Sequence, residues 1–191
     1  MFTGIVKSIG SIKTLQEDRL LISTDDDTFH NLEYGTSVSI DGCCLTLKEY
    51  IDNKLLFQIS DETISRTSLN KSHCGFVNME LPLTVNSLLS GHIVQGHVDK
   101  VIVLNHYEKL DNELWNFYFK NADKKYIADK GSITLNGVSL TVVNPDEDRF
   151  SVAVIEETYK RTNLQYLKEG SSINVEYDIV IKYLEKLNYD K

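Results

Sequence analysis

The chain lacks several features that define common classes of protein. Its longest apolar runs, such as residues 101–104, are far too short to span a bilayer. No basic start followed by a long apolar stretch is present, so we expect no secretion signal. The cysteines, Cys43, Cys44 and Cys74, are few and form no CxxC pair with metal spacing. We therefore expect reduced thiols in a cytoplasmic protein rather than a disulfide framework.

Basic charge is also scarce. Lys and Arg number 20 against 28 Asp and Glu, which gives a net charge of −8 at pH 7. Binding to nucleic acid depends on Lys and Arg contacts to phosphates, so this composition predicts no nucleic-acid partner. No glycine-rich nucleotide loop occurs either. An acidic chain can still bind a neutral small molecule, and 191 residues suffice for one ordinary domain or two small ones.

The most informative feature that is present is an internal repeat. Four segments of the first half recur in the same order in the second half, at offsets of 92 to 96 residues. The pairs are GIV from Gly4 with GHV from Gly96, VSIDGCCLTL at 38–47 with ITLNGVSLTVV at 133–143, DETISRTSL from Asp61 with EETYKRTNL from Glu156, and VNME from Val77 with INVE from Ile173. Two copies are too few for a solenoid, so we expect two similar domains from a duplicated gene. They span 1–86 and 87–178, with a separate tail at 179–191.

Each copy is typical of short strands. Apolar residues alternate with polar or small ones at 115–119, 150–154 and 173–177, which indicates strands with one buried face. Asp41-Gly42 and Asn136-Gly137 lie between such runs and favour tight hairpins. The pattern predicts an all-β fold with a closed barrel in each half. The segments 62–69 and 157–164 are expected to form short helical connections.

The tail has no counterpart in the first copy. Apolar residues at 179, 181, 184 and 187 alternate with Lys and Glu, and no Gly or Pro interrupts them. We expect a short amphipathic helix over 179–191. Such a helix either caps a core or makes an oligomer contact.

Two equivalent strand starts carry small polar side chains. GCCLT places Cys44 and Thr46 on one face of its strand, and GVSLT places Ser139 and Thr141 on the matching face. Polar pairs of this kind can orient the edge of a heterocyclic ligand. The alternative is simple strand propensity with a cysteine packed as a small hydrophobic residue. Occurrence in both copies favours a shared ligand site.

The copies differ at positions that bear on chemistry. Cys44 is matched by Ser139, and Ile5 by His97, which indicates two similar pockets with unequal tasks. His97 is a candidate acid or base, because histidine is the side chain best suited to exchange protons at physiological pH. The spacing of His92 and His97 in GHIVQGH could suggest a metal site, but no nearby Cys or carboxylate pair completes one. Asp178 follows a strand, where an aspartate most often caps a helix or faces solvent.

At this point the sequence resembles the riboflavin synthase family of the alpha-chain type. MFTGIV at 1–6, GCCLT, SGHIVQGHVD at 90–99, KGSITLNGVSLTV at 130–142 and EETYKRTNL resemble its signatures over nearly the whole chain. Some positions depart from the pattern. Lys100 replaces the usual Gly, Asp41 the usual Asn, Asn136 the usual Asp, and Glu156 the usual Pro.

The resemblance implies two tandem six-stranded Greek-key barrels and a homotrimer held partly by C-terminal helices. Each active site would lie between the first barrel of one subunit and the second barrel of its neighbour. Each barrel would hold one 6,7-dimethyl-8-ribityllumazine, and a four-carbon unit would pass between the two molecules. The implied products are riboflavin and 5-amino-6-ribitylamino-uracil, without a cofactor or metal and without a membrane. Association with a lumazine synthase stays open.

The resemblance also implies site residues. For the first-barrel pocket they are Gly4, Ile5, Val6, Ser37, Cys44, Leu45, Thr46, Gln58, Ile59, Ser60, Asp61, Glu62 and Thr63. For the second-barrel pocket they are Gly96, His97, Val98, Ser139, Leu140, Thr141, Ala153, Val154, Ile155, Glu156, Glu157 and Thr158, with Lys130 near the subunit boundary. The expected catalytic residues are His97 for proton transfer, Ser139 and Asp178 beside it, and Cys44 as nucleophile or orienting group.

Two other classes remain as alternatives. A non-catalytic lumazine- or flavin-binding antenna protein shares the duplicated barrels but loses pocket residues in one half, whereas Cys44, His97, Ser139 and Asp178 are all present here. A flavin-binding module of an electron-transfer protein needs a partner nucleotide domain, for which this sequence has no segment.

Overall fold

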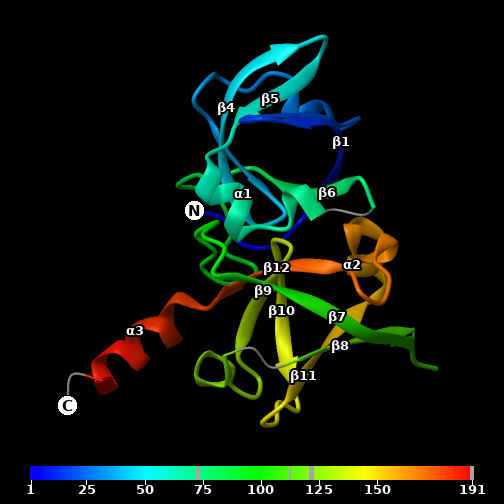
Figure 1. Ribbon diagram of the computed structural model, residues 1–191, viewed down its shortest axis with the longest axis vertical. Coiled ribbons are helices and arrows are strands. Elements are labelled where there is room, and N and C mark those ends of the chain that lie inside the picture. Colours follow the sequence, from blue (N-terminus) through cyan, green and yellow to red (C-terminus); the bar gives the residue numbers. More distant parts are fainter. Residues whose placement is uncertain (72–73, 112, 121–122, 190–191) are drawn as a thin grey trace.

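The computed structural model describes residues 1–71, 74–111, 113–120 and 123–189. Figure 1 shows two barrels stacked along the long axis, the first in blue and cyan and the second in green to orange. Each is a closed six-stranded sheet, and a helix follows the second barrel. The expected all-β fold with two similar barrels is confirmed.

The first barrel contains only antiparallel neighbours in the order β1-β2-β5-β4-β3-β6. Its strands are β1 (Ser8–Gln16), β2 (Arg19–Ser23), β3 (Ser37–Ile40), β4 (Cys43–Ile51), β5 (Lys54–Gln58) and β6 (Phe76–Glu80). Leu20, Ile22, Phe57 and Met79 are fully buried in its core, because alternate residues of each strand face the inside.

The second barrel repeats this topology. Its strands are β7 (Lys100–Lys109), β8 (Leu114–Lys120), β9 (Ser132–Leu135), β10 (Val138–Val143), β11 (Arg149–Ile155) and β12 (Ser172–Tyr177), closed in the order β10-β11-β8-β7-β12-β9. Phe117, Phe119, Phe150, Val152 and Val154 are at most 1% exposed, as the alternation predicts. At 173–177 the expected single buried face is wrong, because Asn174 and Glu176 are also buried, through their bonds at the junction and to the second arm. The register shift between Ile12 and Thr14 in β1 recurs between Leu104 and His106 in β7.

Short helices connect the strands at equivalent places. They are η1 (Asp27–Phe29), α1 (Asp61–Arg66), η2 (Leu69–Lys71), η3 (Lys124–Tyr126), α2 (Glu156–Arg161) and η4 (Asn163–Tyr166). The tail forms α3 (Ile179–Tyr189), which extends away from the second barrel in Figure 1. The helical connections and the tail helix are confirmed, although residues 190–191 of the predicted tail lie outside the described part of the chain.

The two barrels meet at their tight hairpins. Asp41 and Gly42 have φ of 46° and 76°, and Asn136 and Gly137 have φ of 45° and 79°, so both turns use the left-handed region. A Cβ on Gly42 would lie 2.8 Å from the Gly137 nitrogen, and a Cβ on Gly137 would lie 2.7 Å from the Gly42 nitrogen. Glycine is therefore required at both turns because they touch across the junction.

Buried amides crosslink this junction. Asn78 donates through its backbone nitrogen to Asp41 Oδ1 (2.7 Å), and Asn174 donates likewise to Asn136 Oδ1 (2.8 Å). The Asn78 side chain also reaches the Asn136 carbonyl (2.8 Å), and the Asn174 side chain reaches the Asp41 carbonyl (2.8 Å). Asn163 adds a bond from Nδ2 to Asp41 Oδ1 (3.0 Å). Buried polar groups that are paired in this way hold the barrels in one relative orientation.

Two segments cross between the barrels. We call residues 1–6 the first arm and residues 91–98 the second arm. They pair through Phe2 and Val94, whose backbone bonds measure 2.7 and 3.1 Å, and the N-terminus lies at the junction in Figure 1. Val6 packs into the core of the second barrel, whereas Val98 packs against the core of the first. Each arm therefore contributes to the barrel that it does not belong to in sequence.

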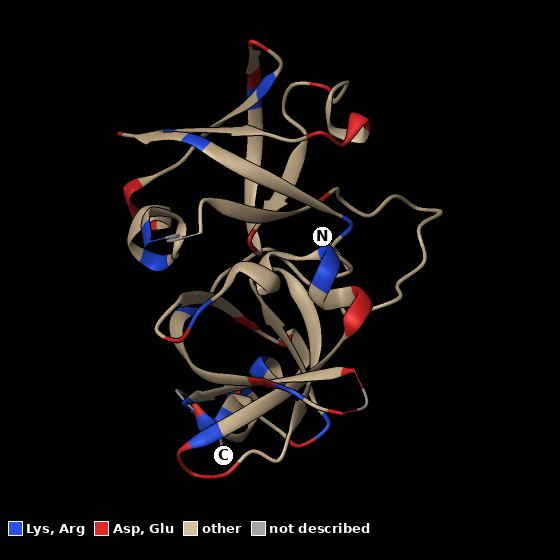
Figure 2. Ribbon diagram, turned by 90° about the vertical axis from the view of Figure 1, so that its right-hand side faces the viewer, with Lys and Arg blue, Asp and Glu red and all other residues tan. Residues whose placement is uncertain are grey.

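Charges are spread over the molecule. Figure 2 shows Lys and Arg interspersed with Asp and Glu along the ribbons of both barrels. Among the residues that the structure describes, no helix has the length and apolarity needed to cross a bilayer. Within the same residues, no group of three or more His, Cys, Asp and Glu side chains is arranged to hold a metal ion.

Candidate functional site

The second arm closes over Cys44 of the first barrel. The Cys44 backbone nitrogen donates to the Gly96 carbonyl (2.8 Å), and a Cβ on Gly96 would lie 2.6 Å from the Cys44 Cβ. Gly96 has φ of 80°, so both the conformation and the close approach require glycine. The same relation joins the first arm to the second barrel: Ser139 nitrogen donates to the Gly4 carbonyl (2.8 Å).

This exchange corrects the sequence-based grouping of the two pockets. Gly4, Ile5 and Val6 were expected beside Cys44, and Gly96, His97 and Val98 beside Ser139. The structure reverses both assignments, because the arms cross. Matching repeats aligns residues within a copy and carries no information about which barrel an arm reaches. We call the Cys44 pocket with residues 96–98 of the second arm the first half-site, and the Ser139 pocket with the first arm and His92 the second half-site.

In the first half-site the two adjacent cysteines differ. Cys43 is buried, and burial raises the pKa of its thiol to about 12, so it stays protonated and unreactive. Cys44 points to the other face of β4 and is half-buried. It is therefore the thiol that a ligand in the first half-site can reach.

An open depression of about 480 Å³ lies along the strand β4 that carries Cys44. It is lined by Thr46, Lys48, Gln58, Ile59 and Ser60, which include four expected site residues. This volume lies within the usual range for small-molecule pockets. Lys48 was missed in the sequence, because its counterpart Val143 in the second copy is apolar and the repeat therefore gave no signal.

Helix α1 supplies the remaining first-barrel residues. Ser60 caps the helix, since its side chain accepts from the Thr63 nitrogen (3.1 Å). Asp61 and Glu62 are exposed in the first turn. Ser37 lies opposite Thr46 in the β3–β4 ladder and is half-buried. Of these residues, Ser60 lines the depression along β4.

The second half-site contains a hydroxyl–imidazole pair. His92 Nδ1 lies 2.7 Å from Ser139 Oγ, and His92 Nε2 lies 3.0 Å from Thr134 Oγ1. Burial lowers the pKa of His92, and Asp178 opposes that shift electrostatically. With the proton on Nε2, the free Nδ1 accepts from the Ser139 hydroxyl and makes its oxygen a better hydrogen-bond acceptor or nucleophile.

His92 is the functional residue that sequence reasoning misassigned. It was considered only as a metal ligand with His97, but hydroxyls occupy both of its ring nitrogens. It precedes the part of the second arm that has a counterpart at the N-terminus, so the repeat did not reveal it. Its place in GHIVQGH was the only sequence signal for a functional role. That motif does not show which strand the His92 ring contacts.

Of the expected catalytic residues His97, Ser139 and Asp178, the structure places only two in the same half-site. His97 lies on the second arm beside the first half-site, exposed to solvent, and its backbone nitrogen donates to Glu176 (2.9 Å). Asp178 accepts from the Val180 nitrogen (2.9 Å) and so caps α3, while its charge acts on His92. Asp178 and Ser139 therefore belong to one half-site and His97 to the other.

The other expected residues divide by exposure. Thr141, Ile155, Glu157 and Lys130 are exposed, and Ala153, Glu156 and Thr158 are half-buried. The side chains of Val6, Leu45, Ile59, Leu140 and Val154 are buried at 8% exposure or less. The exposed side chains can contact a ligand directly, and Ile59 of the buried set lines the depression along β4.

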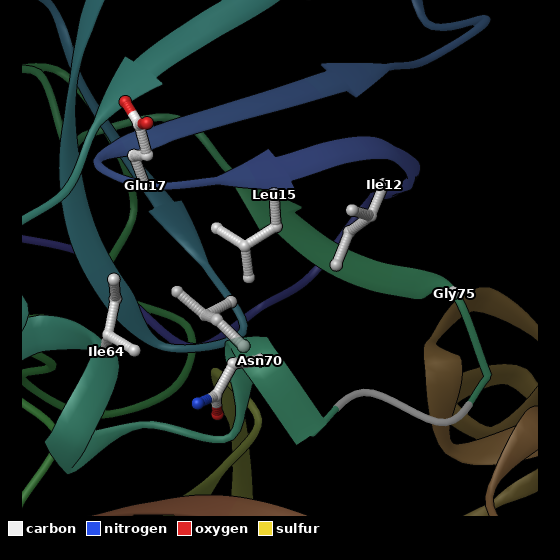
Figure 3. Close-up of a pocket in the computed structure, with 7 residues that line it drawn as sticks. Ile12, Leu15, Glu17, Ile64, Asn70 and Gly75 are labelled. Carbon is white, nitrogen blue, oxygen red and sulfur yellow. The ribbon is translucent and has the colours of Figure 1, made fainter.

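A second depression in the first barrel was not expected. Figure 3 shows Ile12 and Leu15 of β1 facing Ile64 of α1, with Asn70 below them. The depression has a volume of about 420 Å³ and Leu69 also lines it. It lies between β1 and α1. The second barrel fills the equivalent space with aromatic rings.

The comparisons with known proteins identify the family of the chain. The family model of the lumazine binding domain matches twice, at residues 3–82 and 95–178. The chain belongs to the lumazine-binding domain family. Two crystal structures of LumP are similar, one complexed with riboflavin (TM-score 0.84, 27% identity, 93% of this chain and 99% of that chain) and one complexed with 6,7-dimethyl-8-(1'-D-ribityl) lumazine (TM-score 0.80, 26% identity, 92% and 98%).

Within this family, the chain is a member of the riboflavin synthases. The riboflavin synthase of Actinobacillus pleuropneumoniae is 36% identical over 97% of this chain and 89% of its own length. The riboflavin synthase of Bacillus subtilis (strain 168) is 32% identical over 100% and 93%. The resemblance inferred from the repeated motifs is confirmed.

Proposed function

We propose that this protein converts two molecules of 6,7-dimethyl-8-ribityllumazine into riboflavin and 5-amino-6-ribitylamino-uracil. The observation that carries the proposal is a pair of equivalent half-sites with unequal chemistry. Cys44 and Ser139 occupy matching strand positions, and each is bonded through its backbone nitrogen to the glycine of a crossing arm. A reaction in which one molecule donates and an identical molecule accepts needs two similar pockets that perform different steps.

The chemistry needs few groups. The atoms of two lumazines equal those of the two products, so the transfer requires no external oxidant. One methyl group must lose a proton, for which a positioned base contributes roughly 10²–10⁴-fold. We assign this step to His97, which is exposed at the first half-site. Ser139, oriented by His92, and Cys44 are the candidates for addition to the donor ring.

Holding both lumazine molecules in one site supplies much of the rate enhancement. Two rings stacked in a fixed orientation replace a bimolecular encounter, an effect worth ~7–11 kcal/mol. We propose that the rings stack between the first half-site of one subunit and the second half-site of its neighbour in a homotrimer. An apolar stripe on α3 supports an oligomer, since Val180, Tyr183, Leu184 and Leu187 are 57%, 64%, 56% and 65% exposed. Their spacing places them on one face of the helix.

The solution state follows from the same observations. The described thiols, Cys43, Cys44 and Cys74, form no disulfide, in keeping with a reducing compartment, and we propose a cytoplasmic location. Association with a lumazine synthase stays a prediction, which co-sedimentation of the two purified proteins tests.

A second candidate function is a non-catalytic antenna protein. The similarity to LumP complexed with riboflavin favours it, because the fold is shared. Identity is higher to riboflavin synthases, at 31–36%, than to LumP, at 25–27%. The chain also carries Cys44 and the Ser139–His92 pair in its two half-sites.

One assay separates the two functions. Purified protein is incubated with 6,7-dimethyl-8-ribityllumazine alone, and riboflavin absorbance is followed. Steady formation of riboflavin supports the enzyme. Tight binding of lumazine, seen by a change in its fluorescence, without any riboflavin would overturn the proposal in favour of the antenna protein.

A further inference from the structure

Two carboxylates at equivalent ends of β6 and β12 hold the crossing arms. Glu80 is the last residue of β6, and Glu176 is the penultimate residue of β12, 96 positions later. Glu176 is only 2% exposed, and burial raises the pKa of both carboxyl groups. A buried carboxylate needs several donors to offset its lost hydration, and each of these receives three.

Glu176 accepts from three successive backbone nitrogens of the second arm. Oε1 accepts from Gln95 (2.7 Å), and Oε2 accepts from Gly96 (2.9 Å) and His97 (2.9 Å). Successive N–H groups that include a residue with positive φ form a concave anion-binding nest. The carboxylate occupies this nest and so determines the direction in which the Gly96 carbonyl points.

Glu80 holds the first arm in a related way. Its oxygens accept from Thr3 nitrogen (2.8 Å), Thr3 Oγ1 (2.6 Å) and Gly4 nitrogen (3.0 Å). The Ile5 nitrogen donates instead to Thr3 Oγ1 (3.0 Å). The threonine hydroxyl therefore takes the place of the third backbone bond, and Ile5 is linked to Glu80 only through it.

We propose that Glu176 and Glu80 are positioning residues for the two half-sites. Glu176 of the second barrel holds the second arm, whose Gly96 carbonyl accepts from the Cys44 nitrogen of the first barrel. Glu80 of the first barrel holds the first arm, whose Gly4 carbonyl accepts from the Ser139 nitrogen of the second barrel. Glu176 thereby positions the part of the second arm that borders the first half-site, and the His97 nitrogen donates directly to it. Glu80 positions the first arm, which borders the second half-site.

The arrangement requires a carboxylate rather than an amide. Glutamine has nearly the same shape but presents an NH₂ group where one oxygen accepts, and this group would face the N–H donors of the arm. Glu176→Gln therefore releases at least one bond and loosens the second arm over Cys44. The matched variant Glu80→Gln loosens only the first arm.

The first test reads the reactivity of Cys44 and does not depend on catalysis. The full chain and each variant are treated with iodoacetamide, and modification of Cys44 is separated from that of Cys43 by tandem mass spectrometry. We expect alkylation of Cys44 to be several-fold faster in Glu176→Gln and unchanged in Glu80→Gln. Equal rates in wild type and Glu176→Gln, or equal acceleration in both variants, would overturn the proposal.

The second test reads turnover and rests on the proposed function. Displacement of the second arm should lower kcat, because a misplacement of about 1 Å in a site can lower the rate roughly 10²-fold. Val175→Ala is the control, because it truncates the neighbouring core residue of the same strand and acts on stability alone. We expect Glu176→Gln to lower kcat per folded molecule while Val175→Ala leaves it unchanged. Equal loss in both variants means that the carboxylate is only structural.

A third variant keeps the proposal falsifiable if Glu176→Gln does not fold. Gly96→Ala adds a Cβ against Cys44 and displaces the same arm from the opposite side. We expect it to accelerate Cys44 alkylation as well, and an unchanged rate would contradict the proposal. If the wild type binds lumazine without turnover, the proposed function fails, while the alkylation results still decide the role of Glu176.

Discussion

The two barrels share one topology but pack their connecting helices differently. In the second barrel the Trp115 and Tyr159 rings stack with centroids 4.0 Å apart and planes inclined by 8°, which fastens α2 to the barrel. In the first barrel the equivalent positions are Asp18 and Ile64, and a depression of about 420 Å³ lies behind α1. Duplication preserved the strand pairing, which the backbone specifies, and allowed the side-chain packing beneath the helices to diverge.

The two half-sites also differ in how completely the protein orients their side chains. Ser139 is bonded to His92 within its own chain, so the second half-site has an oriented hydroxyl before any ligand arrives. Cys44 is bonded to the second arm through its backbone nitrogen, and a depression that starts at Thr46 lies farther along the same strand. The second barrel is thus the more completely organised of the two, and the predictions below test that contrast.

The largest expected effect distinguishes the two histidines. His97→Ala removes the proposed base of the first half-site, and we expect kcat to fall roughly 10²–10⁴-fold with the fold intact. His92→Ala removes only the group that orients Ser139, so we expect a smaller loss. Steady-state riboflavin formation measures both. His106→Ala, at an exposed pair with Glu169, is the control, and full activity in His97→Ala would refute the role of that residue.

The next effect tests the aromatic packing of the second barrel. Trp115→Ala removes the ring that stacks on Tyr159 and should lower the free energy of unfolding by about 3–5 kcal/mol. The buried indole Nε1 of Trp115 has no hydrogen-bond partner among the described residues, and such a group costs about 1–3 kcal/mol. Trp115→Phe should therefore cost far less. Urea unfolding measures both, and equal losses would contradict the stacking argument.

A third effect separates the two hairpins at the junction. Burial raises the pKa of Asp41 to about 8, whereas the equivalent residue is Asn136. Between about pH 4 and pH 8 the unfolded chain ionises Asp41 while the folded protein keeps the proton, so stability falls as pH rises. Asp41→Asn should remove this loss and raise stability near pH 8 by on the order of 1–3 kcal/mol.

The matched control for this prediction is Asn136→Asp. It places a second buried carboxyl at the equivalent turn and should steepen the loss of stability with rising pH. Thermal unfolding followed from pH 4 to pH 9 compares the three proteins. A wild-type curve parallel to that of Asp41→Asn over this range would show that Asp41 titrates normally.

The sequence predicted the barrels because strand alternation and the Asp41-Gly42 and Asn136-Gly137 turns are local signals. The repeat also identified Cys44 and Ser139 as equivalent positions. What it could not predict was the crossing of the arms, since a bond from Gly96 to Cys44 joins residues from different copies. Alignment within each copy therefore assigned both arms to the wrong pockets.

Residues without a counterpart in the other copy could not be predicted from the sequence either. His92 and Lys48 act through contacts made only after folding, and neither has a counterpart of the same chemistry in the other copy. Glu176 and Glu80 did align, within VNME and INVE, but a glutamate at a strand end usually faces solvent. Only the geometry of the arms distinguishes these carboxylates from surface charges.

The smallest expected effect fills the depression behind α1. Ile64→Tyr places a ring where the second barrel has Tyr159, against Leu15 of β1 (Figure 3). Without a partner equivalent to Trp115, we expect a gain below about 1 kcal/mol in the free energy of unfolding. Hydrogen exchange of the α1 amides should slow towards that of α2. If α1 and α2 already exchange equally in the wild type, the depression does not loosen α1, and the two barrels differ in packing but not in the mobility of their connecting helices.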